Sequence, residues 1–475
     1  MKTLPYLAAA LAATISALQL FSPSALCAAS AADTYTVTLL SPRANTRSDQ
    51  RPIPIGFYDA GANKTFVTWM GANSTAVVKE LDNATGKWSA DKVVGASLLV
   101  DKHNYPGMLR GADGRIHIFY GCHNSTLRQA ISPAPLSIDG QWQDGPVAEA
   151  ERASYPAPIV TTDGTLYVFY RDTRLTNKYA DDRPYQMVKS TDGGKTWTRH
   201  MVVDPFPRTT DNMCEVYNGK VTYQPASADG KQPARIHLAW TIAGEKAGRH
   251  AHATYGRNLY YAWLNPANDH LYNIEGRDLG TTITNETLDK YCLVLDTGIP
   301  DTGHWAGLMV SAHYRDNGSP LIVFDSHLHD GLTSATWDAG TRSWQFTRIA
   351  AHIDPRETEK TGPDSFRVYR PQGSAVEIYE TADAGAHWKL AGAINIPASL
   401  GESQFIDNGR GGQSGKTDAK SLVVRAAIDR IHVIENARPD AKFLLTQAGD
   451  NEINEARRNV YIVAEKKGAE SGKQE

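Results

Sequence analysis

The sequence predicts an all-β propeller, and three observations support this fold class. The first is an internal repeat: residues 103–120 and 154–170 both run from a Tyr-Pro pair through an Asp-Gly turn into an alternating strand. The second is "STDGGKTW" at 190–197, an Asp-box, in which the Asp holds a hairpin turn and the Trp packs between neighbouring strands. The third is that the chain has no convincing amphipathic helix of useful length. Repeated strand units without helices are typical of a propeller.

Further strands are predicted before and after this region. Early strands are expected at 34–42 and 64–71, and the turn within 81–88 closes a hairpin on a Trp. Two weaker copies of the Asp-box fall at 337–344 and 381–388. Later strand units start tens of residues apart, which is the spacing of a four-stranded blade. These units are 234–241, 257–263, 319–327, 374–380 and 430–435. The runner-up architecture, a β-sandwich with a helical companion, has no long helical segment to support it.

The composition limits the classes of function. The chain has 475 residues, which exceeds the usual size of one domain, but repeat folds are an exception. We therefore expect one propeller domain over residues 32–475, ending in a short disordered tail. A net charge of −3 argues against a nucleic-acid partner bound through its phosphates. No run of about 20 apolar residues follows residue 31, so no membrane span is predicted, and we expect a monomer.

Residues 1–31 are typical of a secretory signal. Lys2 supplies a positive start, an apolar segment follows, and small residues form the cleavage site. A membrane anchor fits less well, because the apolar run is short and is broken by Pro5 and by serines. Lipid attachment at Cys27 is disfavoured by the large Leu26 before it. We therefore expect a bacterial protein that is secreted or periplasmic.

Removal of this segment would leave three cysteines, an odd number for an exported protein. They are Cys122, Cys214 and Cys292, and the pair His250 and His252 lies between the last two. Thiolates and imidazoles are the ligands that zinc prefers. We therefore expect one structural zinc ion held by His252 with Cys214 or Cys292, and His250 as a further candidate ligand. Buried thiols beside a surface histidine pair are the alternative, and no organic cofactor is expected.

Four polar side chains fall at strand edges next to the two repeats: His103, His123, Tyr155 and Arg171. Strand edges of adjacent blades can meet on the central face of a propeller, so these side chains could converge. A histidine, a tyrosine and an arginine together suit removal of a proton beside a carboxylate. Taken singly, each has a structural explanation: a hydrogen-bonded histidine, a packed tyrosine, or a salt bridge between Arg171 and Asp172.

The stretches 103–128, 154–172 and 190–197, with "IHLAWT" and "YGRNLYYAW" further along, resemble the BNR-repeat polysaccharide lyases of families 24 and 25, which cleave ulvan. The similarity runs from roughly residue 50 to residue 330 and is weaker beyond. It implies a seven-bladed propeller acting by β-elimination on an anionic algal polysaccharide, at uronic acid residues next to sulfated rhamnose.

The resemblance also implies roles for individual residues. The catalytic histidine of the family corresponds to His103, the second histidine to His123, the active-site tyrosine to Tyr155 and the carboxylate-binding arginine to Arg171. Two divisions of labour remain open. In one, Arg171 binds the uronate carboxylate, His103 takes the proton and Tyr155 protonates the leaving oxygen. In the other, Tyr155 does both after ionising beside Arg171, and the two histidines hold the carboxylate.

Further substrate contacts and two rival functions complete the prediction. Another family tyrosine corresponds to Tyr223 or to Tyr217, and Asn104 and Asn124 are expected to contact the substrate. An exo-sialidase also uses Asp-box propellers, but it needs three arginines and a Tyr-Glu pair, and residues 51–58 match its N-terminal arginine motif only loosely. A carbohydrate-binding propeller without catalysis is the third hypothesis.

Overall fold

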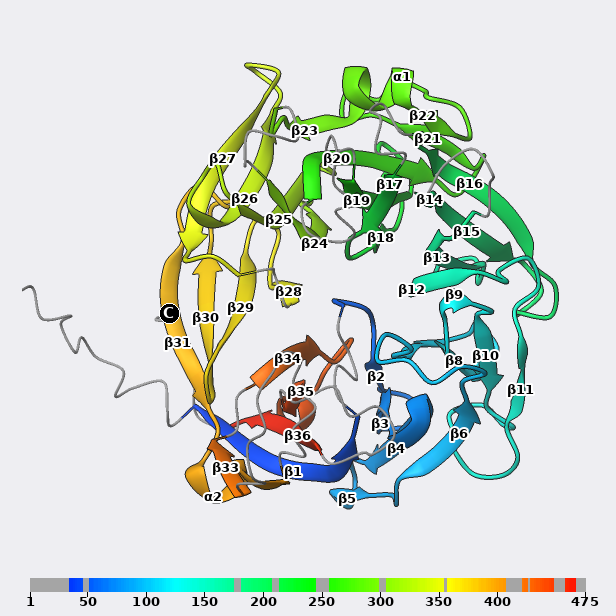
Figure 1. Ribbon diagram of the computed structural model, residues 1–475, viewed down its shortest axis with the longest axis vertical. Helices are drawn as coiled ribbons and strands as arrows, with labels where there is room; N and C mark the ends of the chain where they lie inside the picture. The colour runs from blue at the N-terminus through cyan, green and yellow to red at the C-terminus, as the bar shows by residue number, and fades with distance from the viewer. Residues whose placement is uncertain are drawn as a thin grey trace, which may run out of the picture.

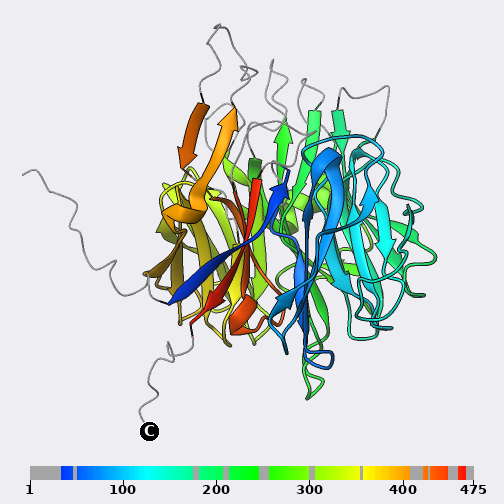
Figure 2. The ribbon, with the colours of Figure 1, turned by 90° about the horizontal axis from the view of Figure 1, so that it is seen from below.

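The computed structural model describes residues 34–45, 51–174, 181–206, 213–244, 256–298, 305–353, 357–406, 421–425, 428–447 and 458–466. Its sheets stand around one central axis, and the chain passes round the ring once, from the blue end to the red end (Figure 1). In side view most strands run along this axis (Figure 2). The predicted all-β propeller is confirmed.

The strands of the first half of the ring form three sheets. The first contains β2 (Gly56–Asp59), β3 (Lys64–Met70), β4 (Thr75–Asp82), β5 (Lys87–Trp88) and β6 (Lys92–Ala96). The second contains β7 (Gly107–Arg110), β8 (Ile116–Tyr120), β10 (Arg128–Ile131) and β11 (Gln143–Pro146). The third contains β9 (His123–Ser125), β12 (Ala153–Val160), β13 (Leu166–Asp172), β15 (Tyr185–Ser190), β16 (Thr198–Asp204) and β22 (Ile283–Thr284).

The remaining strands form three more sheets and a hairpin. The fourth sheet has β14 (Asp181–Arg183), β17 (Met213–Asn218), β18 (Thr222–Gln224), β19 (Arg235–Gly244), β20 (Gly256–Asn265), β21 (His270–Tyr272), β23 (Leu293–Leu295), β24 (Ala306–Tyr314), β25 (Pro320–Ser326), β26 (Gly331–Asp338) and β27 (Ser343–Ala350). The fifth has β28 (Glu357–Lys360), β29 (Phe366–Gln372), β30 (Ala375–Thr381) and β31 (Lys389–Asn395). The sixth has β1 (Tyr35–Ala44), β34 (Ile428–Val433), β35 (Phe443–Gln447) and β36 (Arg458–Glu465), and the hairpin is β32 (Glu402–Ile406) with β33 (Ser421–Arg425).

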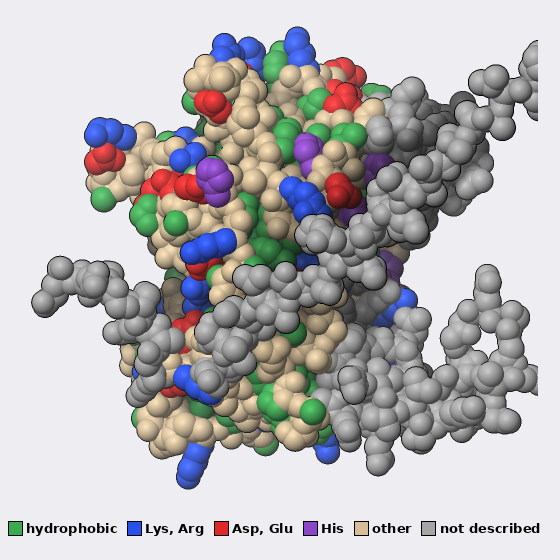
Figure 3. Space-filling model, turned by 90° about the vertical axis from the view of Figure 1, so that its left-hand side faces the viewer, with side chains coloured by type: hydrophobic (Ala, Val, Ile, Leu, Met, Phe, Trp, Pro, Cys, Tyr) green, Lys and Arg blue, Asp and Glu red, His purple; other side chains and the backbone are tan. Residues whose placement is uncertain are grey.

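The helices within the described residues are all short. They are α1 (Asn285–Thr287), α2 (Ala398–Gly401), the 3-10 turns Ala72–Ser74 and Pro439–Ala441, and the π turn Leu288–Cys292. None of the described helices has the length and apolar character needed to cross a membrane. On the outer face shown in Figure 3, basic and acidic side chains are interspersed, in keeping with a net charge of −3.

The ring is closed by its two ends, and one of its sheets is larger than expected. β1 pairs with β36, with Thr38 opposite Ile462, so the first and last described strands share a sheet. The prediction of a seven-bladed propeller is wrong: the described strands form a six-bladed propeller, with six sheets around the axis besides the hairpin. The cause is a pairing of Gly256 with Ala306, which joins β20 to β24 and merges two sets of strands into one sheet of eleven.

The Asp-box forms the turn between β15 and β16. Its Asp192 accepts the backbone N–H of Thr196 at 3.0 Å, and Trp197 packs edge-on against Phe119 of the second sheet at 5.7 Å between ring centroids. In the weaker copy at 381–388 the Asp accepts a backbone N–H at 2.9 Å in the turn between β30 and β31. These turns therefore fix strand pairs and contacts between sheets.

A buried ionic cluster joins strands from three sheets near the axis. Lys220, between β17 and β18, donates to the carboxylate of Glu357 and to the carbonyl oxygen of Thr358 at 2.9 Å. His432 of β34 lies 3.7 Å from the other oxygen of the same carboxylate. Burial by itself raises the pKa of Glu357, but the charge of Lys220 and the contact with His432 outweigh it and lower the pKa to about 2. Glu357 is therefore ionised inside the ring.

We expect Glu357→Gln to lower the free energy of unfolding by about 3 kcal/mol, because it leaves the partly buried ammonium group of Lys220 without its carboxylate. The folded-state pKa is depressed from 4.5 to about 2, so the contribution of the carboxylate is complete above pH 4.5 and is lost as the pH falls toward 2. Denaturant unfolding of both proteins at several pH values measures this, and the gap between them should shrink over that interval.

The matched control is Glu275→Gln, which breaks an exposed ion pair with Arg342 and should cost at most about 1 kcal/mol. Equal effects of the two substitutions at neutral pH would contradict the contribution of the buried ionic cluster to stability.

Candidate active site

Tyr155 lies at the centre of the candidate site, near the start of β12. The pairing of β12 with β13 shifts between Ser154 and Ala157, and Tyr155 has a φ of +61°, in the left-handed region. The side chain of Asn218 donates a hydrogen bond to the carbonyl oxygen of Tyr155 at 3.2 Å. Bulges re-aim side chains, and such strained residues persist only where their surroundings hold them. The backbone thus takes Tyr155 out of the regular alternation of the strand.

Two arginines pack against the ring of Tyr155. The Cζ atoms of Arg51 and Arg171 lie 4.1 Å and 4.5 Å from its centroid. The same atoms lie 5.2 Å and 4.9 Å from the centroid of Tyr217, and the two tyrosine rings are 6.1 Å apart. These are cation–π distances. Two positive charges are therefore shared between two aromatic rings.

Arg171 is fully buried beneath this layer. Its guanidinium group lies 3.6 Å from the carboxylate of Glu215, which also lies 3.4 Å from Arg183 and accepts the hydroxyl of Tyr217 at 3.1 Å. Glu215 and the Arg171 side chain both have 0% exposure. None of the three guanidinium nitrogens of Arg171 makes a hydrogen bond of ordinary geometry to a described residue. A polysaccharide cannot touch this guanidinium directly in the conformation described.

His103 and His123 lie next to each other beside Tyr155. His103 precedes β7 and His123 begins β9, and their ring centroids are 4.2 Å apart. The centroids of these two rings lie 6.1 Å and 5.8 Å from that of Tyr155. Both imidazoles are partly exposed. Three groups able to transfer protons or donate hydrogen bonds therefore meet within reach of one small ligand.

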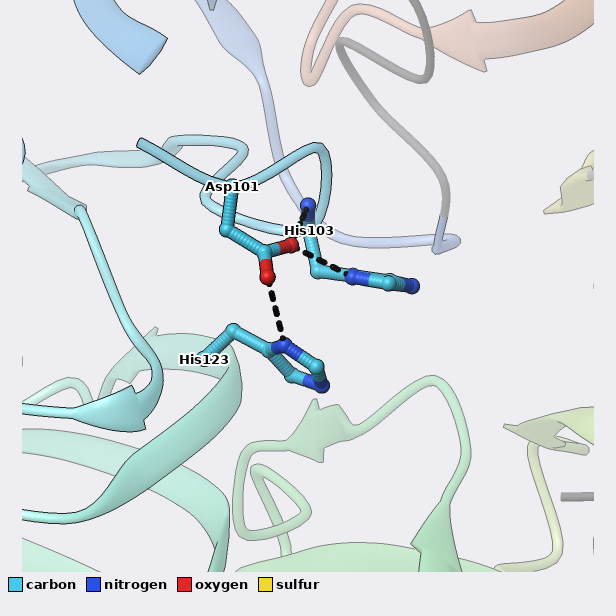
Figure 4. A group of neighbouring side chains, drawn as sticks. All are labelled: Asp101, His103 and His123. Carbon is cyan, nitrogen blue, oxygen red and sulfur yellow. Dashed lines mark hydrogen bonds and ion pairs between the residues drawn. The ribbon is translucent and has the colours of Figure 1, made fainter. Parts of the chain in front are cut away.

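Asp101 lies between the two histidines (Figure 4). Its two carboxylate oxygens are 2.6 Å from Nδ1 of His103 and 3.0 Å from Nδ1 of His123. Burial by itself raises the pKa of Asp101, but the hydrogen bonds from both histidines outweigh it and hold the pKa well below its ordinary range. Asp101 is therefore a carboxylate shared by two imidazoles.

The other expected substrate contacts are more dispersed. Asn104 is buried, and its side chain donates to the carbonyl oxygen of Leu99 at 2.5 Å. Asn124 is exposed and accepts the hydroxyl of Thr173 at 2.6 Å. Tyr223 lines a cavity of about 330 Å³ between the inner strands. Of the two candidate tyrosines, the structure therefore places Tyr217, and not Tyr223, against Tyr155.

The expected zinc ligands lie only partly within the described residues. Cys214 and Cys292 are both buried, whereas His250 and His252 lie outside the described residues. Burial raises the pKa of the Cys292 thiol to about 12. The zinc site predicted from these cysteines and histidines therefore remains a prediction, because its two histidines lie outside the described residues.

Among the described residues, one group of three side chains has metal-ligand atoms within 4.8 Å of one another: Asp101, His103 and His123. Tetrahedral zinc, with bonds of roughly 2.0–2.2 Å, keeps its ligand atoms about 3.3 Å apart. The separations of 2.6 Å and 3.0 Å from Nδ1 to oxygen are instead hydrogen-bond distances. The short distances between these side chains are therefore explained by hydrogen bonds from the histidines to Asp101.

Three residues of the site were not predicted as site residues from the sequence. Asp101 stands only two positions before His103, so a hydrogen bond between their side chains could have been predicted from the sequence. Arg51 was considered only as part of a loose sialidase-like motif. Nothing in the sequence around Glu215 indicates a site residue, because its partners Arg171 and Arg183 come from other strands.

Two relatives are similar to the chain over most of its length. An ulvan lyase from Alteromonas sp. (strain LOR) is 22% identical over 459 residues, which cover 87% of this chain and 84% of the relative. Ulvan Lyase-PL25 from Pseudoalteromonas sp. (strain PLSV) is 24% identical over 445 residues, again covering 87% and 84%. These are similarities of whole chains, since most of each protein is aligned.

A solved structure agrees with this fold. A polysaccharide lyase PL25 ulvan lyase bound to -[GlcA(1-4)Rha3S]- superposes with a TM-score of 0.67 at 19% identity, covering 90% of this chain and 96% of that chain. At this identity the likeness establishes the fold. Residues 64–351, well over half of the chain, match the family described as BNR repeat-containing family member. The chain belongs to this BNR repeat-containing family.

Proposed function

We propose that the protein is a polysaccharide lyase that cleaves ulvan by β-elimination at its uronic acid residues. The observation that supports this most directly is the meeting of two histidines and a tyrosine above two buried guanidinium groups. That arrangement occurs in a chain whose relatives, aligned over 87% of its length, are ulvan lyases. These residue types suit abstraction of a proton next to a carboxylate.

The uronate carboxylate is held by His103 and His123. The C5 proton of a uronate is weakly acidic, so the charge on the adjacent carboxylate must be stabilised before the proton can leave. Both imidazoles are partly exposed and lie 4.2 Å apart, whereas Arg171 has no exposed surface. This difference favours the histidines over Arg171 as the groups that contact the substrate.

Tyr155 transfers the protons. Its phenolate takes the C5 proton, the electron pair of that bond forms the C4–C5 double bond, and the C4–O bond breaks. The leaving oxygen then takes the proton from Tyr155, which returns the residue to its starting state. Arg51 and Arg171, 4.1 Å and 4.5 Å from the ring centroid, stabilise the negative charge that this role requires.

The sialidase alternative is weaker. The hydroxyl of Tyr217 does bond to the carboxylate of Glu215, as a tyrosine nucleophile and its partner would. Both residues are buried, however, and Glu215 is flanked by Arg171 and Arg183. A sialidase needs its arginines open to the carboxylate of its substrate, whereas the side chains of Arg171 and Glu215 have no exposed surface.

Residues 1–31 lie outside the described residues, and we propose that they are a signal for export that is removed from the mature protein. Export would bring the enzyme to an algal polysaccharide that is too large to enter the cell.

We propose that the mature protein acts as a monomer.

We expect purified protein incubated with ulvan to produce an increase in ultraviolet absorbance, because elimination creates a conjugated double bond in the new uronate end. Hydrolysis of the same linkage creates no such bond. Release of shorter oligosaccharides without the absorbance would contradict a lyase, and no release at all would favour a carbohydrate-binding propeller.

We expect Tyr155→Phe to lower kcat by about 10²–10⁴, because the variant keeps the ring and removes the group that transfers the proton. Tyr185→Phe is the matched control: Tyr185 is fully buried, and its hydroxyl makes no hydrogen bond to a described residue. The control should keep wild-type activity. A Tyr155→Phe protein that folds and cleaves ulvan at the wild-type rate would refute the assignment.

We also propose the structural zinc ion expected from the sequence, held by His252 with Cys214 or Cys292. Elemental analysis of the purified protein should then give about one zinc ion per chain, since structural zinc sites bind tightly. Either Cys214→Ser or Cys292→Ser should lower this content and the thermal stability together, and the one that does so identifies the ligand. Protein that is folded and active without stoichiometric metal would exclude the ion.

A further inference from the structure

We propose that Asp101 is a positioning residue that holds a proton on Nδ1 of both His103 and His123, so that both imidazoles present Nε2 to the substrate. Its effect on rate rests on the proposed lyase function, whereas the protonation pattern of the two histidines does not. The inference starts from geometry, since one carboxylate contacts two imidazoles through the same ring nitrogen of each.

The chemistry of the carboxylate fixes the direction of both hydrogen bonds. An ionised carboxylate only accepts hydrogen bonds, and its oxygens lie 2.6 Å and 3.0 Å from Nδ1 of His103 and of His123. Each Nδ1 must therefore carry a proton. In a neutral imidazole this leaves Nε2 with its lone pair, and in a cationic one Nε2 carries a second proton. Both rings extend from Asp101 toward the same side (Figure 4).

Asp101 is itself held by the backbone around it. The hydroxyl of Ser74 donates to the carbonyl oxygen of Asp101 at 2.8 Å and accepts its backbone N–H at 3.1 Å. The carboxylate also accepts the backbone N–H of His103 at 2.8 Å. A residue fixed at its main chain and at its side chain can orient the rings that bond to it.

The single charge of Asp101 also limits the charge of the pair. The two imidazole centroids are 4.2 Å apart, a distance at which two positive charges repel strongly. One carboxylate between them compensates one positive charge. The unit of Asp101, His103 and His123 is therefore suited to carry one cationic imidazole, whose Nε2–H can donate to the single carboxylate of a uronate residue.

The test is Asp101→Asn, with Asp163→Asn as its matched control. The asparagine keeps the shape, but its amide nitrogen donates and cannot accept a hydrogen bond from Nδ1, so one histidine must move its proton to Nε2. Asp163 accepts the backbone N–H two residues ahead at 3.1 Å, as Asp101 does, but the side chain that bonds to it is the hydroxyl of Thr161 and not a histidine. We expect kcat on ulvan to fall by about 10- to 100-fold in Asp101→Asn and to stay unchanged in the control.

The second readout is nuclear magnetic resonance of protein labelled with 15N-histidine, in which protonated and unprotonated ring nitrogens have different shifts. The signals of His103 and His123 are assigned from the spectra of His103→Gln and His123→Gln. We expect a protonated Nδ1 on both histidines in the wild type and on only one in Asp101→Asn. Identical protonation patterns in the two proteins, or an unprotonated Nδ1 in the wild type, would overturn the inference.

The two readouts separate this inference from the proposed function. The spectra need no substrate, so they decide the role of Asp101 even if the wild type does not cleave ulvan. A wild type that cleaves ulvan beside a fully active Asp101→Asn would leave the lyase function standing and refute the positioning role.

Discussion

The geometry of the site depends on Arg51, which connects distant parts of the ring through one guanidinium group. Its Nη1 donates to the carbonyl oxygens of Asn218 at 2.7 Å and Leu308 at 3.1 Å, in β17 and β24. Because Arg51 precedes β2, these bonds join the entry to the first sheet with the sheet of eleven strands. The same group packs on Tyr155 at 4.1 Å. Because two backbone carbonyls fix the guanidinium group of Arg51, they also fix the position of the Tyr155 ring that packs on it.

The site is consequently built in two layers. The lower layer holds fixed charges, with Arg171 and Glu215 shielded from solvent, where electrostatic interactions are stronger than in water. The upper layer holds the groups that can gain or lose protons: His103 and His123 are partly exposed, and Tyr155 is buried directly beside them. Substrate contact and charge stabilisation are therefore assigned to different residues. In the proposed mechanism an arginine can thus stabilise charge without touching the sugar.

The parts of this arrangement that depend on neighbouring residues could be predicted from the sequence. The parts that depend on contacts between distant segments could not. The Asp-box turn and the alternating strands depend on neighbouring residues, so their patterns are readable. His103 and Tyr155 stand next to the repeated strands, which drew attention to them. The shared carboxylate of Asp101 and the pairing of Gly256 with Ala306 depend on how separate segments approach each other. No spacing in the sequence encodes that approach, and the predicted number of seven blades was therefore wrong.

The repeat itself shows what distinguishes a site residue from a core residue. Tyr105 and Tyr155 occupy the same Tyr-Pro position in the two copies, and their rings stack at 6.3 Å with an interplanar angle of 10°. Tyr105 keeps an ordinary backbone, is fully buried, and burial raises the pKa of its hydroxyl. Tyr155 departs through a bulge and a φ of +61° and meets the two histidines. The strained backbone is absent from the copy that only fills the core, so we attribute it to the role proposed for Tyr155 and not to the architecture of the repeat.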